Sequence, residues 1–135
     1  MIFVDTNVII DVSTDDSAWA DWSQEQLDSA VRREPLALNE IVYAELSVGC
    51  RFPDEVDALL TRFGIVIDPT PRRALFLAGK AFQRYRRAGG TRTGVLADFF
   101  IGAHAVIADS VLITRDGGRY RTYFPGIELI TPSVN

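Results

Sequence analysis

The sequence holds one cysteine, one histidine and one lysine in 135 residues. A single cysteine, Cys50, excludes an internal disulfide and a metal cluster held by thiolates, and a single histidine, His104, excludes a multi-histidine metal site. Any metal ion must therefore be held by oxygen atoms. The longest nearly apolar run covers residues 95–108, which is shorter than the roughly 20 residues that cross a bilayer. No transmembrane helix is predicted.

The rest of the composition is that of an ordinary globular domain. Hydrophobic residues make up 47% and charged residues 24% of the chain, so a core can form and disorder is excluded. A chain of this length forms one compact domain, which we expect to span residues 1–135. Met1 is followed directly by Ile2, Phe3 and Val4, without the basic segment that begins a secretory signal. We therefore expect a cytoplasmic protein.

The net charge of −4 argues at first against a nucleic-acid partner. It comes from 14 basic and 18 acidic residues, so gathering four acids in one metal site would leave 14 residues of each sign elsewhere. Basic patches could then still contact phosphates. All basic residues except Lys80 are arginine. Arginine suits phosphate recognition, although high-GC codon usage gives the same bias.

Short apolar runs alternate with longer amphipathic stretches along the chain. The short runs show no polar–apolar alternation, which is typical of parallel strands covered on both faces. The predicted strands are residues 2–4, 36–38, 65–67, 111–114 and 127–130. Helices are predicted after the turn at residues 5–7 and over residues 17–33, 40–48, 55–64, 73–87 and 95–108. This order predicts an α/β fold of three layers around a parallel sheet.

Asp5 and Asp116 each lie within two residues of the end of a predicted strand. Asp5 comes after the first strand and Asp116 after the fourth. Ligands of parallel α/β sheets bind beyond the carboxyl ends of the strands, so both carboxylates are candidates for chemistry. Either residue could instead shape a turn, and Asp116, which precedes Gly117 and Gly118, has the stronger turn pattern.

Two further acids lie on predicted helices, where solvation alone does not explain them. Glu45 projects from or beside the apolar stripe of its helix. Asp98 is the one acid in the apolar helix at residues 95–108, where an unpaired buried carboxylate would be prohibitive. Asp98 therefore needs a nearby cation, or it lies in the first helical turn, where the helix dipole favours acids. Glu45 could be a residue at the edge of the apolar stripe that pairs with an arginine.

The sequences around these acids together resemble PIN-domain ribonucleases of the VapC toxin type. The matching segments are Val4-Asp5-Thr6-Asn7, Glu45 in Tyr-Ala-Glu-Leu, Asp98 in Leu-Ala-Asp-Phe-Phe-Ile-Gly-Ala-His-Ala, and Thr114-Arg115-Asp116. The resemblance covers the whole chain. It implies a five-stranded sheet of order 3-2-1-4-5 that brings Asp5 and Asp116 together. It also implies metal-dependent RNA cleavage, a small VapB-type antitoxin partner and a homodimer.

Carboxylates gathered within a few ångströms repel one another, so such a cluster calls for a divalent cation. Oxygen ligands suit Mg²⁺ or Mn²⁺, which would activate a water for attack on a phosphodiester. The expected catalytic residues are Asp5, Glu45, Asp98 and Asp116. Asp5 and Asp98 are expected to be the main metal ligands, and Asp116 a direct or water-mediated one. Glu45 is expected to be a ligand or to orient the water.

Two further groups of residues are candidates for supporting roles. Hydrogen bonds that orient the metal ligands are expected from Thr6, Asn7 and Thr114. Contacts to RNA are expected from the basic segment with Arg84, Arg86, Arg87 and Arg92. Ordinary explanations exist for both groups, namely capping and turn bonds for the first and a solvated helix end for the second.

The remaining conspicuous side chains are assigned structural roles. Trp19 and Trp22 are expected to pack in the core, with a groove for a partner as the alternative, and Cys50 and His104 are expected to be packing residues. The acids expected at the surface or at helix caps are Asp11, Asp15, Asp16 and Asp109.

Other classes with this fold pattern fit the sequence less well. A receiver domain with Asp68 as phosphoacceptor also needs an acidic pair after the first strand and a lysine near the last strands, whereas Lys80 lies within a helix. A phosphatase of the haloacid dehalogenase type needs Asp-x-Asp after the first strand, where this chain has Asp5-Thr6-Asn7. A noncatalytic RNA-binding or scaffold domain of the PIN type stays open, because a sequence shows ligand types and not bound metal.

Overall fold

A computed structural model describes residues 1–132, so the last three residues of the expected domain lie outside the described part. Five parallel strands form one sheet in the order β3-β2-β1-β4-β5. The strands are β1 (Ile2–Val4), β2 (Leu36–Leu38), β3 (Ile65–Ile67), β4 (Val111–Ile113) and β5 (Leu129–Ile130). The predicted fold class and strand order are confirmed, while the last two strands are shorter than predicted.

The helices of the described residues connect and cover these strands. They are α1 (Thr6–Ser13), α2 (Ala20–Val31), α3 (Glu40–Ser47), α4 (Pro53–Phe63), α5 (Arg72–Arg87), α6 (Leu96–Ile107) and α7 (Gly118–Tyr123). Local signals fix several ends. The Oδ1 atom of Asn39 accepts hydrogen bonds from the first backbone amides of α3, and Gly64 ends α4 in the left-handed region with φ 65°.

Two helices differ from the sequence prediction. Helix α2 begins at Ala20 rather than at residue 17, because the carboxylate of Asp16 accepts hydrogen bonds from the backbone amides of Ala18 and Trp19 and holds a turn there. Asp16 thus caps the turn before α2, while the helix itself begins without a side-chain cap. Helix α7 was not predicted, since Gly117 and Gly118 at its start favour a turn.

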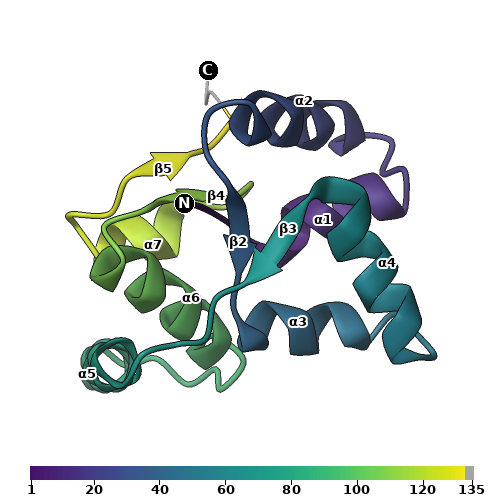
Figure 1. Ribbon diagram of the computed structural model, residues 1–135. Helices are drawn as coiled ribbons and strands as arrows, with labels where there is room; N and C mark the ends of the chain where they lie inside the picture. The colour runs from purple at the N-terminus through teal and green to yellow at the C-terminus, as the bar shows by residue number, and fades with distance from the viewer. Residues whose placement is uncertain (133–135) are drawn as a thin grey trace.

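The elements form three layers, which Figure 1 shows with α1, α2 and α4 on one side of the sheet and α5, α6 and α7 on the other. The first two crossovers run from β1 to β2 and on to β3, and the chain then returns to β4 on the opposite side of β1. The winding therefore reverses between β1 and β4, where open α/β sheets place their ligands. No helix within residues 1–132 is long and apolar enough to span a membrane.

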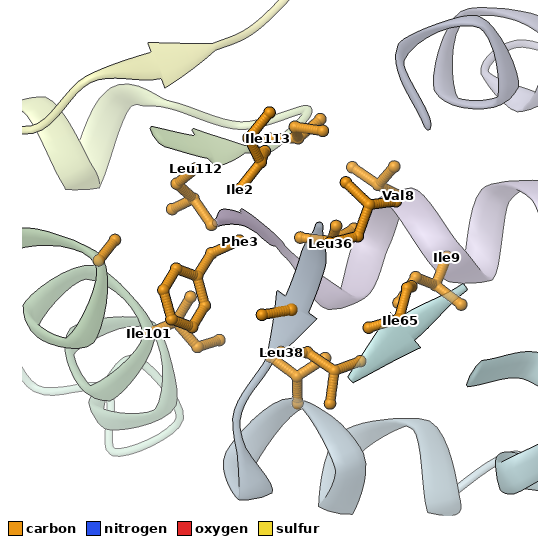
Figure 2. Close-up of a cluster of buried hydrophobic side chains, with 14 of the residues drawn as sticks. Ile2, Phe3, Val8, Ile9, Leu36, Leu38, Ile65, Ile101, Leu112 and Ile113 are labelled. Carbon is orange, nitrogen blue, oxygen red and sulfur yellow. The ribbon is translucent and has the colours of Figure 1, made fainter. Parts of the chain in front are cut away.

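The core lies on both faces of β1, β2 and β4. All three residues of β1 are buried, and Figure 2 shows Phe3 pointing toward α6 while Val8 and Ile9 lie on α1. Cys50 and Trp22 are partly buried and pack against this core, as predicted, whereas Trp19 is partly exposed, and its ring faces the guanidinium of Arg115. Packing of this kind fixes the carboxyl ends of the strands in space.

His104 packs in the core and also joins α6 to two strand ends. Its ring lies 4.6 Å from that of Phe3. Nδ1 lies 3.2 Å from Nδ2 of Asn39 and accepts its hydrogen bond, since Oδ1 of Asn39 is already used at the start of α3. Nε2 therefore carries the proton and donates to Asp68 at 2.9 Å. His104 has the predicted packing role, strengthened by two hydrogen bonds.

Asp11 is buried, so its prediction as a surface or capping acid was wrong. Its side chain is 2% exposed and accepts two hydrogen bonds from the guanidinium of Arg115, each of 2.9 Å, and one from Ser23. The partner lies 104 positions away in the chain, which no local pattern reveals. Asp15 and Asp109 are exposed, as predicted.

Candidate metal centre

The site lies where the carboxyl ends of β1 and β4 meet. The backbone amide of Asp5 donates to the carbonyl of Ile113 at 2.9 Å, which continues the pairing of the two strands. Asp5 is the last residue before α1 and Asp116 lies in the turn between β4 and α7. The two acids therefore project from neighbouring strand ends.

The carboxylate of Asp5 is buried and held by three hydrogen bonds. Oδ1 accepts from the backbone amide of Thr6 at 2.8 Å, which caps α1. Oδ2 accepts from the hydroxyls of Thr114 at 2.8 Å and Tyr120 at 2.9 Å. Among the ion pairs of residues 1–132, none involves Asp5. Burial raises the pKa of Asp5 to about 6, and its hydrogen bonds only partly oppose that rise.

This raised pKa has a defined effect on stability. The folded protein binds the Asp5 proton more tightly than the unfolded chain, so this group contributes stability below pH 3.8, its ordinary pKa. That contribution is lost as the pH rises through about 6. At neutral pH the charged Asp5 side chain therefore destabilises the fold unless a cation lies beside it.

Glu45 reaches the same region from α3. Its side chain is half-buried, and Oε1 accepts a hydrogen bond of 2.7 Å from the hydroxyl of Thr6. Thr6 follows Asp5 directly, so one short segment orients both acids. This hydrogen bond directs the side chain of Glu45 toward Thr6. The position of Glu45 beside the apolar stripe of α3 did not predict this orientation.

Asp98 lies in the first turn of α6, and its cationic partner is Arg119. Oδ2 accepts a hydrogen bond from Nη1 of Arg119 in α7. Both side chains are about one third exposed, at 32% and 31%. Burial nevertheless raises the pKa of Asp98, because it outweighs the opposing effect of Arg119.

The turn that carries Asp116 is braced from α1. The hydroxyl of Thr114 accepts from the backbone amide of Asp116 at 3.2 Å while it donates to Asp5. Asn7 accepts from the backbone amide of Arg115 at 3.2 Å. The ion pair between Asp11 and Arg115 ties the same turn to the interior. Thr6, Asn7 and Thr114 thus all contact the acids or the turn that holds them.

One cavity of about 290 Å³ collects these groups. Its lining residues are Asp5, Thr6, Asn7, Ile10, Glu45, Asp98, Asp116, Arg119 and Tyr120. All four acids singled out in the sequence therefore line the same cavity. Sequence reasoning missed Arg119 and Tyr120. Both lie on α7, which the sequence did not predict, so no local pattern pointed to them.

The donor set fits a divalent metal, although the carboxylates are not gathered into a closed cage. Within residues 1–132 no three acidic, histidine or cysteine side chains are arranged to hold one ion. Asp98 is directed toward Arg119 and Glu45 toward Thr6. A bound cation is favoured by the burial of Asp5, whose carboxylate has no cationic partner among residues 1–132. Asp5 and Asp98 could hold such an ion, with Asp116 as a direct or water-mediated ligand and Glu45 as a ligand or a group that orients water.

The arginines predicted to bind RNA lie outside the cavity lining. Arg84, Arg86 and Arg87 are in the last turns of α5. The guanidinium of Arg84 donates to the carbonyl of Tyr123 at 3.0 Å. Arg92 lies in the segment between α5 and α6, near enough to lower the pKa of Asp98, after the larger effects of burial and Arg119. The basic segment thus borders the end of α6 that carries Asp98.

Fold and site define an α/β protein with an acidic cavity at the winding reversal of a five-stranded parallel sheet. The family model described as PIN domain matches residues 2–125. The chain belongs to the PIN domain family. No curated protein sequence matches the chain significantly.

Solved structures with the same fold include three complexes. The VapBC2 complex of Rickettsia felis, bound to a DNA fragment of its promoter, has a TM-score of 0.73 at 20% identity, over 97% of this chain and 98% of that chain. VapBC-1 of nontypeable Haemophilus influenzae has a TM-score of 0.71 at 20% identity over the same shares. A toxin–antitoxin complex of Klebsiella pneumoniae has 0.70 at 21% identity, over 98% of each chain.

Proposed function

We propose that this chain is a VapC-type toxin that cleaves RNA phosphodiester bonds with the help of Mg²⁺ or Mn²⁺. The convergence of four carboxylates on one cavity carries this proposal, together with the buried Asp5, which has no cationic partner among residues 1–132. Membership of the PIN domain family supports nuclease activity, and the solved complexes of similar fold support the toxin role.

Each acid has a place in this reaction. A bound divalent cation would supply activation of water and stabilisation of negative charge on the phosphate and leaving oxygens. Asp5 is the most rigid ligand, because three hydrogen bonds fix its carboxylate. Glu45, held by Thr6, would act as a ligand or orient the attacking water. Asp98 and Asp116 complete the oxygen ligands from α6 and the turn after β4.

RNA binding is assigned to the basic segment beside the cavity. Arg84, Arg86 and Arg87 lie on α5, which bears no acidic residue, and Arg92 follows it. Positive charge at this place would attract a phosphate backbone toward an otherwise negative cavity. The basic segment would therefore bind the RNA beside the end of α6 that carries Asp98.

A small VapB-type antitoxin and a second copy of this chain are the proposed partners. The toxin–antitoxin complex of Klebsiella pneumoniae and the VapBC complexes of similar fold support the first. The homodimer rests on the resemblance to VapC-type toxins. Val48, Phe52 and Phe76 are exposed at 88%, 65% and 68%, which leaves apolar side chains available for such contacts.

A noncatalytic RNA-binding or scaffold domain is the second candidate. The observation that favours it is the absence of a closed metal cage within residues 1–132. In such a protein the pair of Asp98 and Arg119 would be a permanent structural contact. The two candidates differ in whether RNA is cut.

Cleavage of RNA by the purified chain tests the choice. With Mg²⁺ or Mn²⁺ in millimolar excess, a mixed pool of single-stranded RNA should be cut, and EDTA should stop the reaction because the carboxylates lose their ion. The product ends are read on sequencing gels. RNA that stays intact with either metal while still binding the protein would favour the noncatalytic candidate.

A further inference from the structure

We propose that Arg119 has two successive roles in the acidic cavity. In the metal-free protein it neutralises Asp98, and once Asp98 binds the metal ion the freed guanidinium contacts the substrate phosphate. The inference rests on the proposed function and adds a residue to it. Arg119 belongs to α7, its Nη1 is paired with Asp98, and it lines the cavity with Asp5, Glu45 and Asp116.

The ion pair between Arg119 and Asp98 can separate easily, so that Asp98 can bind a metal ion in place of Arg119. Arg115, four residues earlier, shows what a fixed pair looks like in this protein. Two of its nitrogens bind Asp11, whose side chain is only 2% exposed. Arg119 holds Asp98 through one nitrogen, and both side chains are about one third exposed. Water and solutes reach this second pair, so little is lost when its partners separate.

Asp98 needs a cation whether or not a metal ion is present, because its carboxylate is two thirds buried on the apolar helix α6 and lines one cavity with Asp5, Glu45 and Asp116. Arg119 meets that need in the metal-free protein. It is the one arginine or lysine among the residues that line the cavity. When Asp98 turns to a metal ion, the guanidinium remains at the cavity wall with its planar fork free, a shape that matches phosphate oxygens.

The substitution Arg119→Gln should separate the two roles by effects of opposite sign. Titration calorimetry with Mn²⁺ should show roughly tenfold tighter binding, because a positive charge that competes for Asp98 has gone. The kcat for cleavage of a single-stranded RNA oligonucleotide at saturating Mn²⁺ should fall about 10²-fold, the usual cost of removing one donor to a developing charge. A contact that only braces the fold would not tighten metal binding.

Two matched variants control this experiment. Arg121→Gln removes the same charge from the same helix, but this guanidinium is bonded to Thr131 on the surface, so metal affinity and kcat should stay within about twofold of wild type. Arg119→Lys keeps the charge and loses the fork, so Mn²⁺ affinity should stay near that of wild type while kcat falls. Circular dichroism confirms that each variant is folded.

The possible results separate this inference from the proposed function. Unchanged or weaker Mn²⁺ binding by folded Arg119→Gln overturns the exchange at Asp98. Tighter Mn²⁺ binding with undiminished kcat overturns the phosphate contact. A wild type that neither binds Mn²⁺ nor cuts RNA contradicts the proposed function itself, and this result is seen before any variant is made.

Discussion

Replacing Asp98 or Asp5 by asparagine should lower RNA cleavage by at least about 10³-fold, as expected when a charged ligand of a catalytic metal is lost. The asparagine side chain has the size of aspartate but no charge, so it would hold the metal ion weakly. The fold should persist, because neither substitution removes a packed apolar group. Initial rates of RNA cleavage at millimolar Mg²⁺ or Mn²⁺ and circular dichroism measure the two outcomes.

A third acid provides the control. Asp109 is exposed just beyond the end of α6. Asp109→Asn therefore makes the same chemical change near the helix that carries Asp98, at a residue that does not line the cavity. Its cleavage rate should equal that of wild type. Normal cleavage by both Asp5→Asn and Asp98→Asn would show that the acidic cavity is not the place where RNA is cut.

The substitution Arg115→Met should lower the free energy of unfolding by about 3 kcal/mol, since it leaves a buried carboxylate without its cation. Asp11 is 1% exposed and would retain only the hydroxyl of Ser23 as a partner. The loss should also loosen the turn before Asp116. Urea unfolding at pH 7 measures the change.

The controls isolate the ion pair from the loss of an arginine. Arg121→Met changes an exposed residue of α7 and should shift the free energy of unfolding by no more than about 0.5 kcal/mol. The double variant Asp11→Asn/Arg115→Met should recover part of the loss, because the unpaired charge is removed as well. An Arg115→Met protein as stable as wild type would mean that Asp11 finds solvent or another partner.

The sheet could be predicted because each short apolar run is flanked by strong local signals. Asn39 and Gly64 mark where α3 begins and α4 ends, and both signals act within a few residues. The strand order could not be derived from these signals and came from the resemblance to VapC-type proteins. Helix α7 was missed because Gly117 and Gly118 satisfy a turn equally well.

The acids could be found because each is anomalous in its own segment, most clearly Asp98 in an apolar helix. Their partners could not be found in this way. Arg119 and Tyr120 contact Asp98 and Asp5 across 21 and 115 positions of the chain, and only the assembled fold brings them together. The same is true of Arg115, the partner of Asp11, and without it Asp11 was expected at the surface or at a helix cap.

Thermal unfolding with and without Mn²⁺, at pH 7.5, most directly tests the claim that the acids form one metal site. A cation that binds only the folded protein raises the free energy of unfolding by about 2.7 kcal/mol at one hundred times its Kd. The melting temperature of the wild type should rise accordingly. In Asp5→Asn/Asp98→Asn this rise should vanish, while the metal-free melting temperature stays equal or increases, because the charged form of Asp5 costs stability above pH 6. A wild type unaffected by millimolar Mn²⁺, or a double variant that keeps the full response, would contradict the account.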